Sequence, residues 1–305
     1  MTYIKEKTKQ YLVNFNQIPS PATMTAQEAR AMRTNYPPPS IQPGKVASIE
    51  NKAVRARDGY RIPVRIYTPA GKGPFPVILY YHGGGWVLND LNTCHVSCSL
   101  LAEKTGAIVV SVEYRLAPEY KFPVPLFDAY DAFRAVSEGM EGLRSTGSIS
   151  VAGDSAGGNL ATAVTQLARE EGLTIDAQIL LYPVTDLSYE SGSYKLYGQG
   201  FGLDSDVMKW FGNYYIRTHE DAKDPLVAPI YAELAGLPRA FVLVAENDVL
   251  RDEGLTYAKK LEQSGVQVKQ SIASGLVHSF FTKNDVFEEE IRQTIDEIAA
   301  FLNGR

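Results

Sequence analysis

Cysteine is scarce in this chain, with two among 305 residues. That number is too small for the disulfide framework of a small secreted domain, and it does not supply the roughly four ligands of a structural zinc site. Cys94 and Cys98 are separated by three residues within a segment that we expect to be helical. Both are therefore predicted to be reduced thiols packed in the interior.

Long apolar runs and clusters of basic residues are also missing. No segment approaches the ~18 apolar residues of a membrane-spanning helix. The amino terminus carries Lys5, Glu6, Lys7 and Lys9 and lacks the apolar core of a signal peptide. The formal net charge is −5 and basic residues are dispersed, which argues against nucleic acids and anionic membranes as partners. We therefore expect a cytosolic protein whose charge serves solubility.

The composition is that of an ordinary globular protein, with 45% hydrophobic and 21% charged residues. Short β-rich runs alternate with helical stretches such as 126–136 and 156–171, and a closing helix at 285–302 repeats apolar residues at helical spacing. This alternation predicts a mostly parallel sheet covered on both faces, with its ligand site at the carboxyl ends of the strands. Strands are expected at 77–81, 107–112, 149–152, 179–182, 241–244 and 266–272.

Two segments precede this alternation. Residues 1–45 are expected to form a helical arm, in which Thr25 and Glu28 have the spacing of a capping box for a helix that ends near Asn35, before Tyr36 and three prolines. The arm either packs on the body of the protein or covers the site. Next, Asp58-Gly59 separates two β-rich runs, 46–57 and 61–67, and predicts an antiparallel hairpin at the start of the sheet.

A third segment interrupts the alternation. Residues 188–217 fit no strand or crossover helix and carry Trp210 among several tyrosines and phenylalanines. A long irregular connection in a compact domain is often functional. We therefore divide the chain into the arm, 1–45, and a catalytic domain, 46–305, with an aromatic insertion at about 188–217 that forms a lid over the strand ends.

The central motif is G-x-S-x-G, with Ser155 between Gly153 and Gly157. It follows an apolar strand and precedes a helix, so the chain must turn sharply at the serine while the glycines keep Cβ atoms out of the crowded turn. We expect Ser155 to be exposed at the sheet edge, as a nucleophile. The backbone N–H of Ala156, at the helix start, would provide half of an oxyanion hole.

Three consecutive glycines follow the strand at 77–81. His82 precedes them and Trp86 comes after them. Glycine lets backbone N–H groups approach a ligand without obstruction by side chains. The N–H groups of Gly84 and Gly85 are therefore predicted to complete the oxyanion hole. His82 is expected to support the loop by hydrogen bonding and not to act as a base.

The base must be one of four histidines. His95 lies in a predicted helix and His219 in a polar stretch, whereas His278 follows the last strand, where it can reach Ser155. Acidic residues follow the preceding strand, and among them Asp248 is our candidate for the carboxylate that orients His278, with Asp252 as the fallback. Asp252 is expected to pair or cap at the start of the next helix.

At this point the chain resembles the hormone-sensitive-lipase-like carboxylesterases of the α/β-hydrolase superfamily, in their microbial forms. The resemblance extends over nearly everything from residue 46 onward and rests on HGGGW at 82–86, EYRLAPE at 113–119, FPVP at 122–125, GDSAGGN at 153–159 and HSF at 278–280. It implies an α/β-hydrolase fold with a helical cap made from the arm and the insertion. The family usually has a proline where Val249 follows Asp248 here. Glu113 and Arg115 in the second motif are interpreted as a structural ion pair.

The resemblance implies that Ser155 is the nucleophile, His278 the base, Asp248 the orienting acid, and Gly84, Gly85 and Ala156 the oxyanion hole. Such a site hydrolyses short- to medium-chain acyl esters without a metal or organic cofactor. The alternatives are a lactonase, an amidase or a deacetylase on the same triad, or a ligand-sensing module that has lost turnover. The expected partner is a small-molecule ester, and the expected state is a monomer or homodimer.

Overall fold

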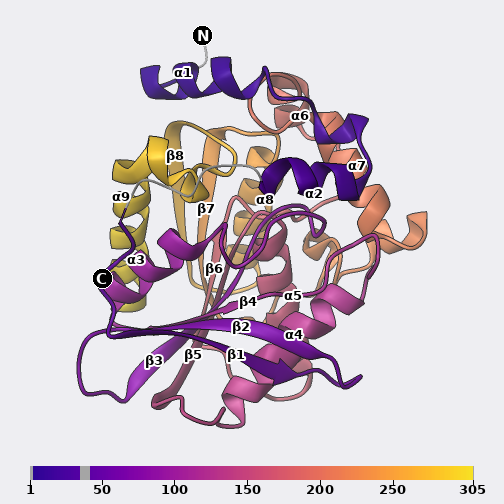
Figure 1. Ribbon diagram of the computed structural model, residues 1–305. Coiled ribbons are helices and arrows are strands. Elements are labelled where there is room, and N and C mark those ends of the chain that lie inside the picture. Colours follow the sequence, from indigo (N-terminus) through magenta and orange to yellow (C-terminus); the bar gives the residue numbers. More distant parts are fainter. Residues whose placement is uncertain (1–2, 35–41, 305) are drawn as a thin grey trace.

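The computed structural model describes residues 3–34 and 42–304. The strands in this part of the chain form one twisted sheet in the order β1-β2-β4-β3-β5-β6-β7-β8 (Figure 1). β2 pairs antiparallel with β1 and β4, and the other neighbouring pairs are parallel. The strands are β1 (Ser48–Arg55), β2 (Arg61–Thr68), β3 (Phe75–Tyr81), β4 (Ile108–Val112), β5 (Ser145–Asp154), β6 (Ala177–Leu181), β7 (Arg239–Asn247) and β8 (Val268–Val277). The predicted hairpin and the six predicted strands are confirmed.

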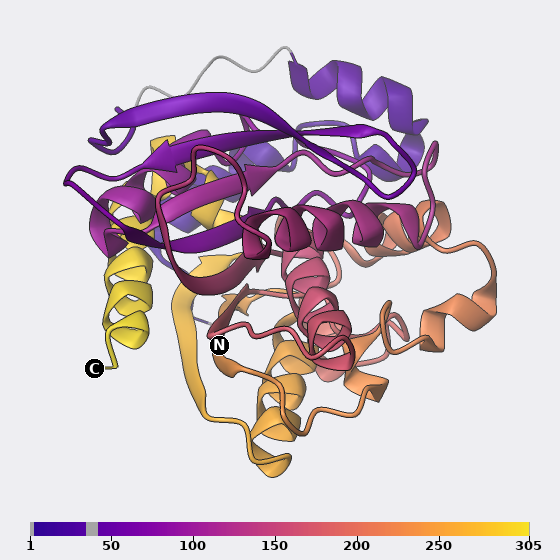
Figure 2. The same ribbon diagram turned by 90° about the horizontal axis from the view of Figure 1, so that it is seen from below.

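Helices cover both faces of the sheet, because successive residues of a buried strand point to opposite sides. Val77 and Leu79 of β3 pack in one apolar cluster with α4 (Val124–Ser137), α5 (Ala156–Glu170) and α8 (Arg251–Gln263). Ile78 and Tyr80 pack in a second cluster with α3 (His95–Thr105) and α9 (Asn284–Leu302). Figure 2 shows the yellow α9 and the magenta α4 on opposite sides of the sheet. The two clusters form the core that holds the strand ends in place.

The arm and the insertion gather above one end of the sheet (Figure 1). The arm contains α1 (Glu6–Phe15), η1 (Pro21–Thr23) and α2 (Ala26–Thr34), and the insertion contains α6 (Gly192–Tyr197) and α7 (Ser205–Tyr215). Further short helices are η2 (His219–Lys223), η3 (Pro229–Tyr231) and η4 (Phe280–Thr282). The Thr25 and Glu28 capping box is confirmed, since each side chain accepts the other residue's backbone N–H, at 2.8 and 3.3 Å. The predicted helix stop at Asn35 and Tyr36 lies outside the described residues.

Hydrogen bonds join the arm directly to the insertion. Asn16 Nδ2 donates to Gly200 O at 3.0 Å, and Trp210 Nε1 donates to Met24 O at 3.0 Å. Apolar packing accompanies them: Leu12 of α1 is buried and lies beside Gly202 of the insertion, whereas the next residue, Val13, is 63% exposed. The two segments therefore pack as one layer above the carboxyl ends of the strands.

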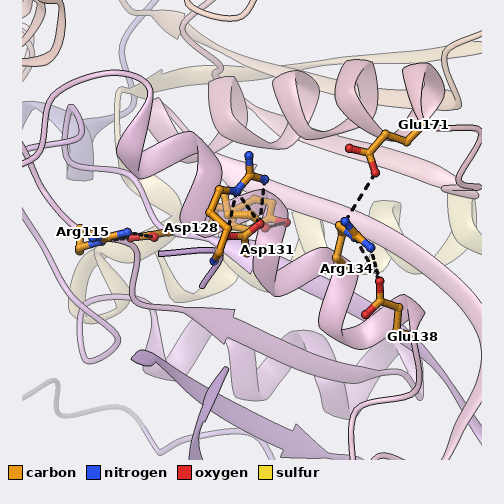
Figure 3. A network of polar contacts seen from close by, with 9 residues as sticks. Arg115, Asp128, Asp131, Arg134, Glu138 and Glu171 are labelled. Carbon is orange, nitrogen blue, oxygen red and sulfur yellow. Dashed lines mark hydrogen bonds and ion pairs between the residues drawn. The ribbon is translucent and has the colours of Figure 1, made fainter. Parts of the chain in front are cut away.

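A network of ion pairs joins the hairpin to α4 and corrects one expectation. Arg115 does not pair with Glu113; it makes two bonds to the buried Asp128, at 2.7 and 2.8 Å, and one to Asp58 at 2.7 Å. Glu113 instead accepts the backbone N–H of Leu91 at 2.7 Å. The predicted pair is wrong because the fold brings two other carboxylates to the guanidinium. Figure 3 shows Arg115 with Asp128, and farther along α4 the contacts of Arg134 with Glu138 and Glu171.

Candidate active site

Ser155 occupies a sharp turn between β5 and α5. Its φ of 56° and ψ of −119° are sparsely populated for a residue with a side chain. A Cβ on Gly153 would lie 2.2 Å from Gly157 O, and one on Gly157 would lie 1.9 Å from Tyr81 O. Only glycine fits at both positions, as the motif predicts: Gly153 makes room within the turn itself, and Gly157 makes room for the end of β3.

Ser155 follows β5 at the carboxyl edge of the sheet, as expected, but the expectation that it is exposed there is wrong. β5 lies in the middle of the sheet, between β3 and β6, and Ser155 is 5% exposed. Residues of the arm and the insertion line the cavity into which it opens. The serine is therefore at the end of a central strand and under a cover that arm and insertion residues provide.

His278 lies between Ser155 and Asp248. Its Nε2 is 2.9 Å from Ser155 Oγ, and its Nδ1 is 2.7 Å from Asp248 Oδ2. Since a carboxylate only accepts, Nδ1–H donates to Asp248, which leaves the lone pair of Nε2 directed at the serine hydroxyl. All three side chains are buried. This arrangement can remove a proton from the serine and hold the resulting positive charge beside Asp248.

The topology explains how residues far apart in the chain meet. β7 ends at Asn247 and β8 at Val277, and these two residues are register partners in neighbouring parallel strands. The next residue on each strand is Asp248 or His278, so both leave the sheet at the same edge. Asp252, the fallback acid, lies in the first turn of α8 and bonds Arg251 at 2.8 Å. The structure thus brings Asp248, and not Asp252, to His278.

Two further residues brace these loops, and the sequence analysis did not identify them. Glu246 Oε2 accepts the backbone N–H of Gly275 and the Ser274 hydroxyl, both at 2.7 Å. The buried Asn247 donates from Nδ2 to Leu276 O at 3.2 Å. The only signal for them was their position immediately before Asp248. They hold the loop of the acid against the loop of the histidine.

The glycine loop after β3 borders the same cavity. Gly84 and Gly85 have φ values of 114° and 61°, and both line the cavity beside Ser155. The loop is anchored at its start by the buried Asp154, whose Oδ1 accepts the Gly83 N–H at 2.9 Å and the Tyr80 hydroxyl at 2.8 Å. Burial raises the pKa of the Asp154 carboxyl. The carboxyl is an anchor that sequence reasoning missed, although it stands beside the serine in the motif.

His82 and Ala156 complete the surroundings of the loop. The Nδ1 of His82 is 2.8 Å from Gly83 O, and its ring stacks on Tyr114 with centroids 4.4 Å apart. The bond to Gly83 O confirms the predicted supporting role of His82, and burial lowers the pKa of its ring. Ala156 is the first residue of α5. N–H groups in a first helical turn have no partner within the helix and attract negative charge.

The cavity has a volume of about 390 Å³. Its floor contains Ser155, His278, Gly84 and Gly85. The arm contributes Tyr11, Phe15, Asn16, Ile18, Pro19, Ser20, Pro21 and Met32, and the insertion contributes Gln199, Gly200, Gly202, Leu203, Asp204, Val207 and Phe211. The ring of Phe211 lies directly on Gly85, where a Cβ would be 2.1 Å from it.

Within residues 3–34 and 42–304, no group of three or more His, Cys, Asp or Glu side chains is arranged to hold a metal ion. None of the helices in this part of the chain is both long enough and apolar enough to cross a membrane.

Comparison with known proteins places this geometry in context. Residues 78–282 match the sequence profile of a family described as having the α/β hydrolase fold. The chain is 38% identical over 248 residues to an ethyl acetate hydrolase of Pseudomonas putida, covering 79% of this chain and 78% of the relative. It is 39% identical over 272 residues to carboxylesterase NlhH of Mycobacterium tuberculosis, covering 85% of each.

A solved structure is similar over almost the full length. It is an ester hydrolase from the metagenome of Lake Arreo, in complex with a bipyridine phosphonate derivative. The TM-score is 0.92 at 33% identity, over 99% of this chain and 98% of the other.

Proposed function

This chain belongs to the hormone-sensitive-lipase-like family of α/β hydrolases and is a carboxylic ester hydrolase, and from that premise we propose that Ser155, His278 and Asp248 carry out the hydrolysis through an acyl-enzyme intermediate. The observation that carries the proposal is the continuous line of contacts, 2.9 Å from Ser155 to His278 and 2.7 Å from His278 to Asp248. Distances of this size are those of a nucleophile, its base and the group that orients the base.

In the first half of the reaction, His278 Nε2 takes the proton from Ser155 Oγ as the oxygen attacks the ester carbonyl carbon. The carbonyl π electrons move to oxygen, and the tetrahedral oxyanion accepts hydrogen bonds from the N–H groups of Gly84, Gly85 and Ala156. Asp248 stabilises the imidazolium. The intermediate collapses, the bond to the alkoxide breaks, and His278 gives its proton to the leaving alcohol.

In the second half, water replaces the alcohol. His278 takes a proton from the water, whose oxygen attacks the acyl carbon bound to Ser155. The second oxyanion uses the same N–H groups. Its collapse breaks the bond to Ser155 Oγ, which recovers a proton from His278, and the carboxylic acid leaves. Each step uses groups that border the described cavity or adjoin Ser155, together with Asp248, which contacts His278 on the side away from Ser155.

The cover above Ser155 supports a preference for short- to medium-chain acyl groups, around butyrate to octanoate. In this proposal the arm, 1–45, and the insertion, about 188–217, form the cap that closes the cavity of about 390 Å³. Each buried methylene adds up to ~0.8 kcal/mol of binding until the chain meets the cap. The relative named for ethyl acetate hydrolysis agrees with small esters.

Labelling of the serine tests the proposal. A p-nitrophenyl phosphonate should phosphonylate the native protein once, and mass spectrometry of the digested protein should locate the adduct at Ser155. Ser155→Ala should fold normally, take no label and lose about 10⁶-fold in kcat on p-nitrophenyl butyrate. Ester turnover retained in Ser155→Ala, or a label on another residue, would refute the assignment of the nucleophile.

A further inference from the structure

Arg30, on α2 of the arm, binds the segment that leaves the glycine loop. Its Nε donates to Val87 O at 2.7 Å, and its Nη2 donates to Ala117 O at 2.6 Å. Val87 and Ala117 are completely buried. The guanidinium presents five N–H donors in a rigid planar fork, so one side chain can hold two carbonyl groups and a carboxylate together.

The outer edge of the same guanidinium carries an ion pair. Nη1 and Nη2 bond the two carboxylate oxygens of Glu119 at 2.9 and 2.8 Å. The Glu119 side chain is 41% exposed, so this pair is screened by water and contributes little to stability. Arg30 therefore makes two kinds of contact, the bonds to the two carbonyl groups and the ion pair with Glu119. Variants of Arg30 and of Glu119 can distinguish their effects.

Val87 O belongs to a tight turn that contains both glycines of the oxyanion loop. The N–H groups of Val87 and Leu88 donate to Gly84 O at 3.1 and 2.9 Å. A third bond, from Ala117 N–H to Trp86 O at 2.8 Å, ties the turn to the segment after β4. Arg30 adds a second connection between the turn and the segment after β4, because it bonds both Val87 O and Ala117 O. The orientation of the turn thus depends on an arginine from the arm.

We propose that Arg30 is a positioning residue for ester hydrolysis, which fixes the turn of residues 84–88 so that the N–H groups of Gly84 and Gly85 point at the oxyanion. This inference rests on the proposed function. Glycine peptides are free to rotate, and donors aimed at a developing charge must be held in advance. An arm that only roofed the cavity would affect substrate binding, whereas Arg30 acts on the transition state.

The test uses the full-length enzyme with Arg30→Met, which keeps an unbranched apolar stem as far as the position of Nε and removes every side-chain donor. Arg30→Lys keeps a charged donor group but lacks the planar guanidinium that can bond two carbonyl groups and a carboxylate together. Glu119→Gln is the control for loss of the ion pair. Trp210→Phe is the control for a loosened arm, because it removes the Trp210 bond to Met24 O that holds the arm to the insertion. Folding is checked by circular dichroism, and kcat and KM are measured on p-nitrophenyl butyrate and octanoate.

The inference predicts a kcat about 10- to 100-fold lower in Arg30→Met, with KM within about 3-fold and the ratio of octanoate to butyrate activity unchanged. Arg30→Lys should be intermediate, and both controls should stay near the native kcat. If Arg30→Met does not fold, the inference requires that the kcat of Arg30→Lys be at least about 3-fold below the kcat of both controls.

Three results would overturn it. They are an unchanged kcat in the folded Arg30 variants, an equal loss in either control, or a loss expressed in KM with a changed chain-length ratio. An inactive native enzyme, or an active Ser155→Ala variant, would refute the proposed function itself. A native enzyme that needs Ser155 but not Arg30 would refute only this inference.

Discussion

Replacing Glu113 by glutamine should change how the stability of the protein depends on pH. Glu113 follows β4, and its carboxylate accepts the Leu91 N–H at 2.7 Å. Burial, with a contribution from the charge of Asp90, raises the pKa of Glu113 from 4.5 to about 6, despite the favourable bond to Leu91. Glutamine keeps an acceptor for the Leu91 N–H and removes the charge, so the variant isolates the cost of ionisation.

Proton linkage determines whether the ionisation of Glu113 stabilises or destabilises the folded protein as the pH rises. Below pH 4.5 the carboxyl is protonated in both states and contributes no difference. As the pH rises, the unfolded chain ionises first and the folded protein only near pH 6, so the folded state loses stability across this window. The shift of the Glu113 pKa from 4.5 to about 6 corresponds to a loss of about 2 kcal/mol in the free energy of unfolding, at about 1.36 kcal/mol per pKa unit. Above pH 6 the loss is complete and constant.

Urea unfolding of the native protein and Glu113→Gln at pH 4 and pH 7.5 measures this difference. The free energy of unfolding of the variant, relative to the native protein, should rise by about 2 kcal/mol between the two pH values. Glu119→Gln is a control of opposite sign, because bonds from Arg30 lower the pKa of Glu119; since the pair is exposed and screened, the relative stability of this variant should fall only slightly as the pH rises. A relative stability of Glu113→Gln that is the same at both pH values would refute the reasoning.

Two further predictions concern activity. Asp248→Asn should lower kcat by about 10⁴-fold, because the amide lacks the negative charge that stabilises the imidazolium and its NH2 group can favour the wrong tautomer of His278, whereas Asp252→Asn should stay within a few-fold of the native enzyme. Steady-state kinetics on p-nitrophenyl butyrate compares them, and the reverse ranking would transfer the role to Asp252. Phe15→Ala, which enlarges the cavity on the arm side, should raise the ratio of octanoate to butyrate kcat/KM by up to about 4-fold per additional methylene accommodated, whereas Val13→Ala, on the exposed side of the same helix, should leave the ratio unchanged. An unaltered profile in Phe15→Ala would mean that the arm does not limit the acyl chain.

Local rules were sufficient for much of the fold. The alternation of apolar runs and helical stretches predicted the parallel strands, and Asp58-Gly59 predicted the hairpin. Thr25 and Glu28 predicted the start of α2, because a capping box joins residues three apart. Gly153 and Gly157 predicted the elbow at Ser155, because only glycine avoids a clash there. In the capping box, the hairpin turn and the contact of Gly153 with Gly157, the interacting atoms are close in the chain, so the residues themselves carry the information.

Contacts between distant segments were decided by the tertiary structure. Sequence order made His278 and Asp248 candidates, but only the register of β7 with β8 brings Asp248, and not Asp252, to within 2.7 Å of His278. The burial of Ser155 depends on where the arm and the insertion pack.

Arg115 could be assigned a partner only after α4 had placed Asp128 beside it. Arg30 carried no motif at all, and its bond to Val87 O spans 57 residues. Side chains so far apart in sequence meet through the packing of whole helices and strands, and that packing depends on the sum of many weak apolar contacts that no single motif encodes.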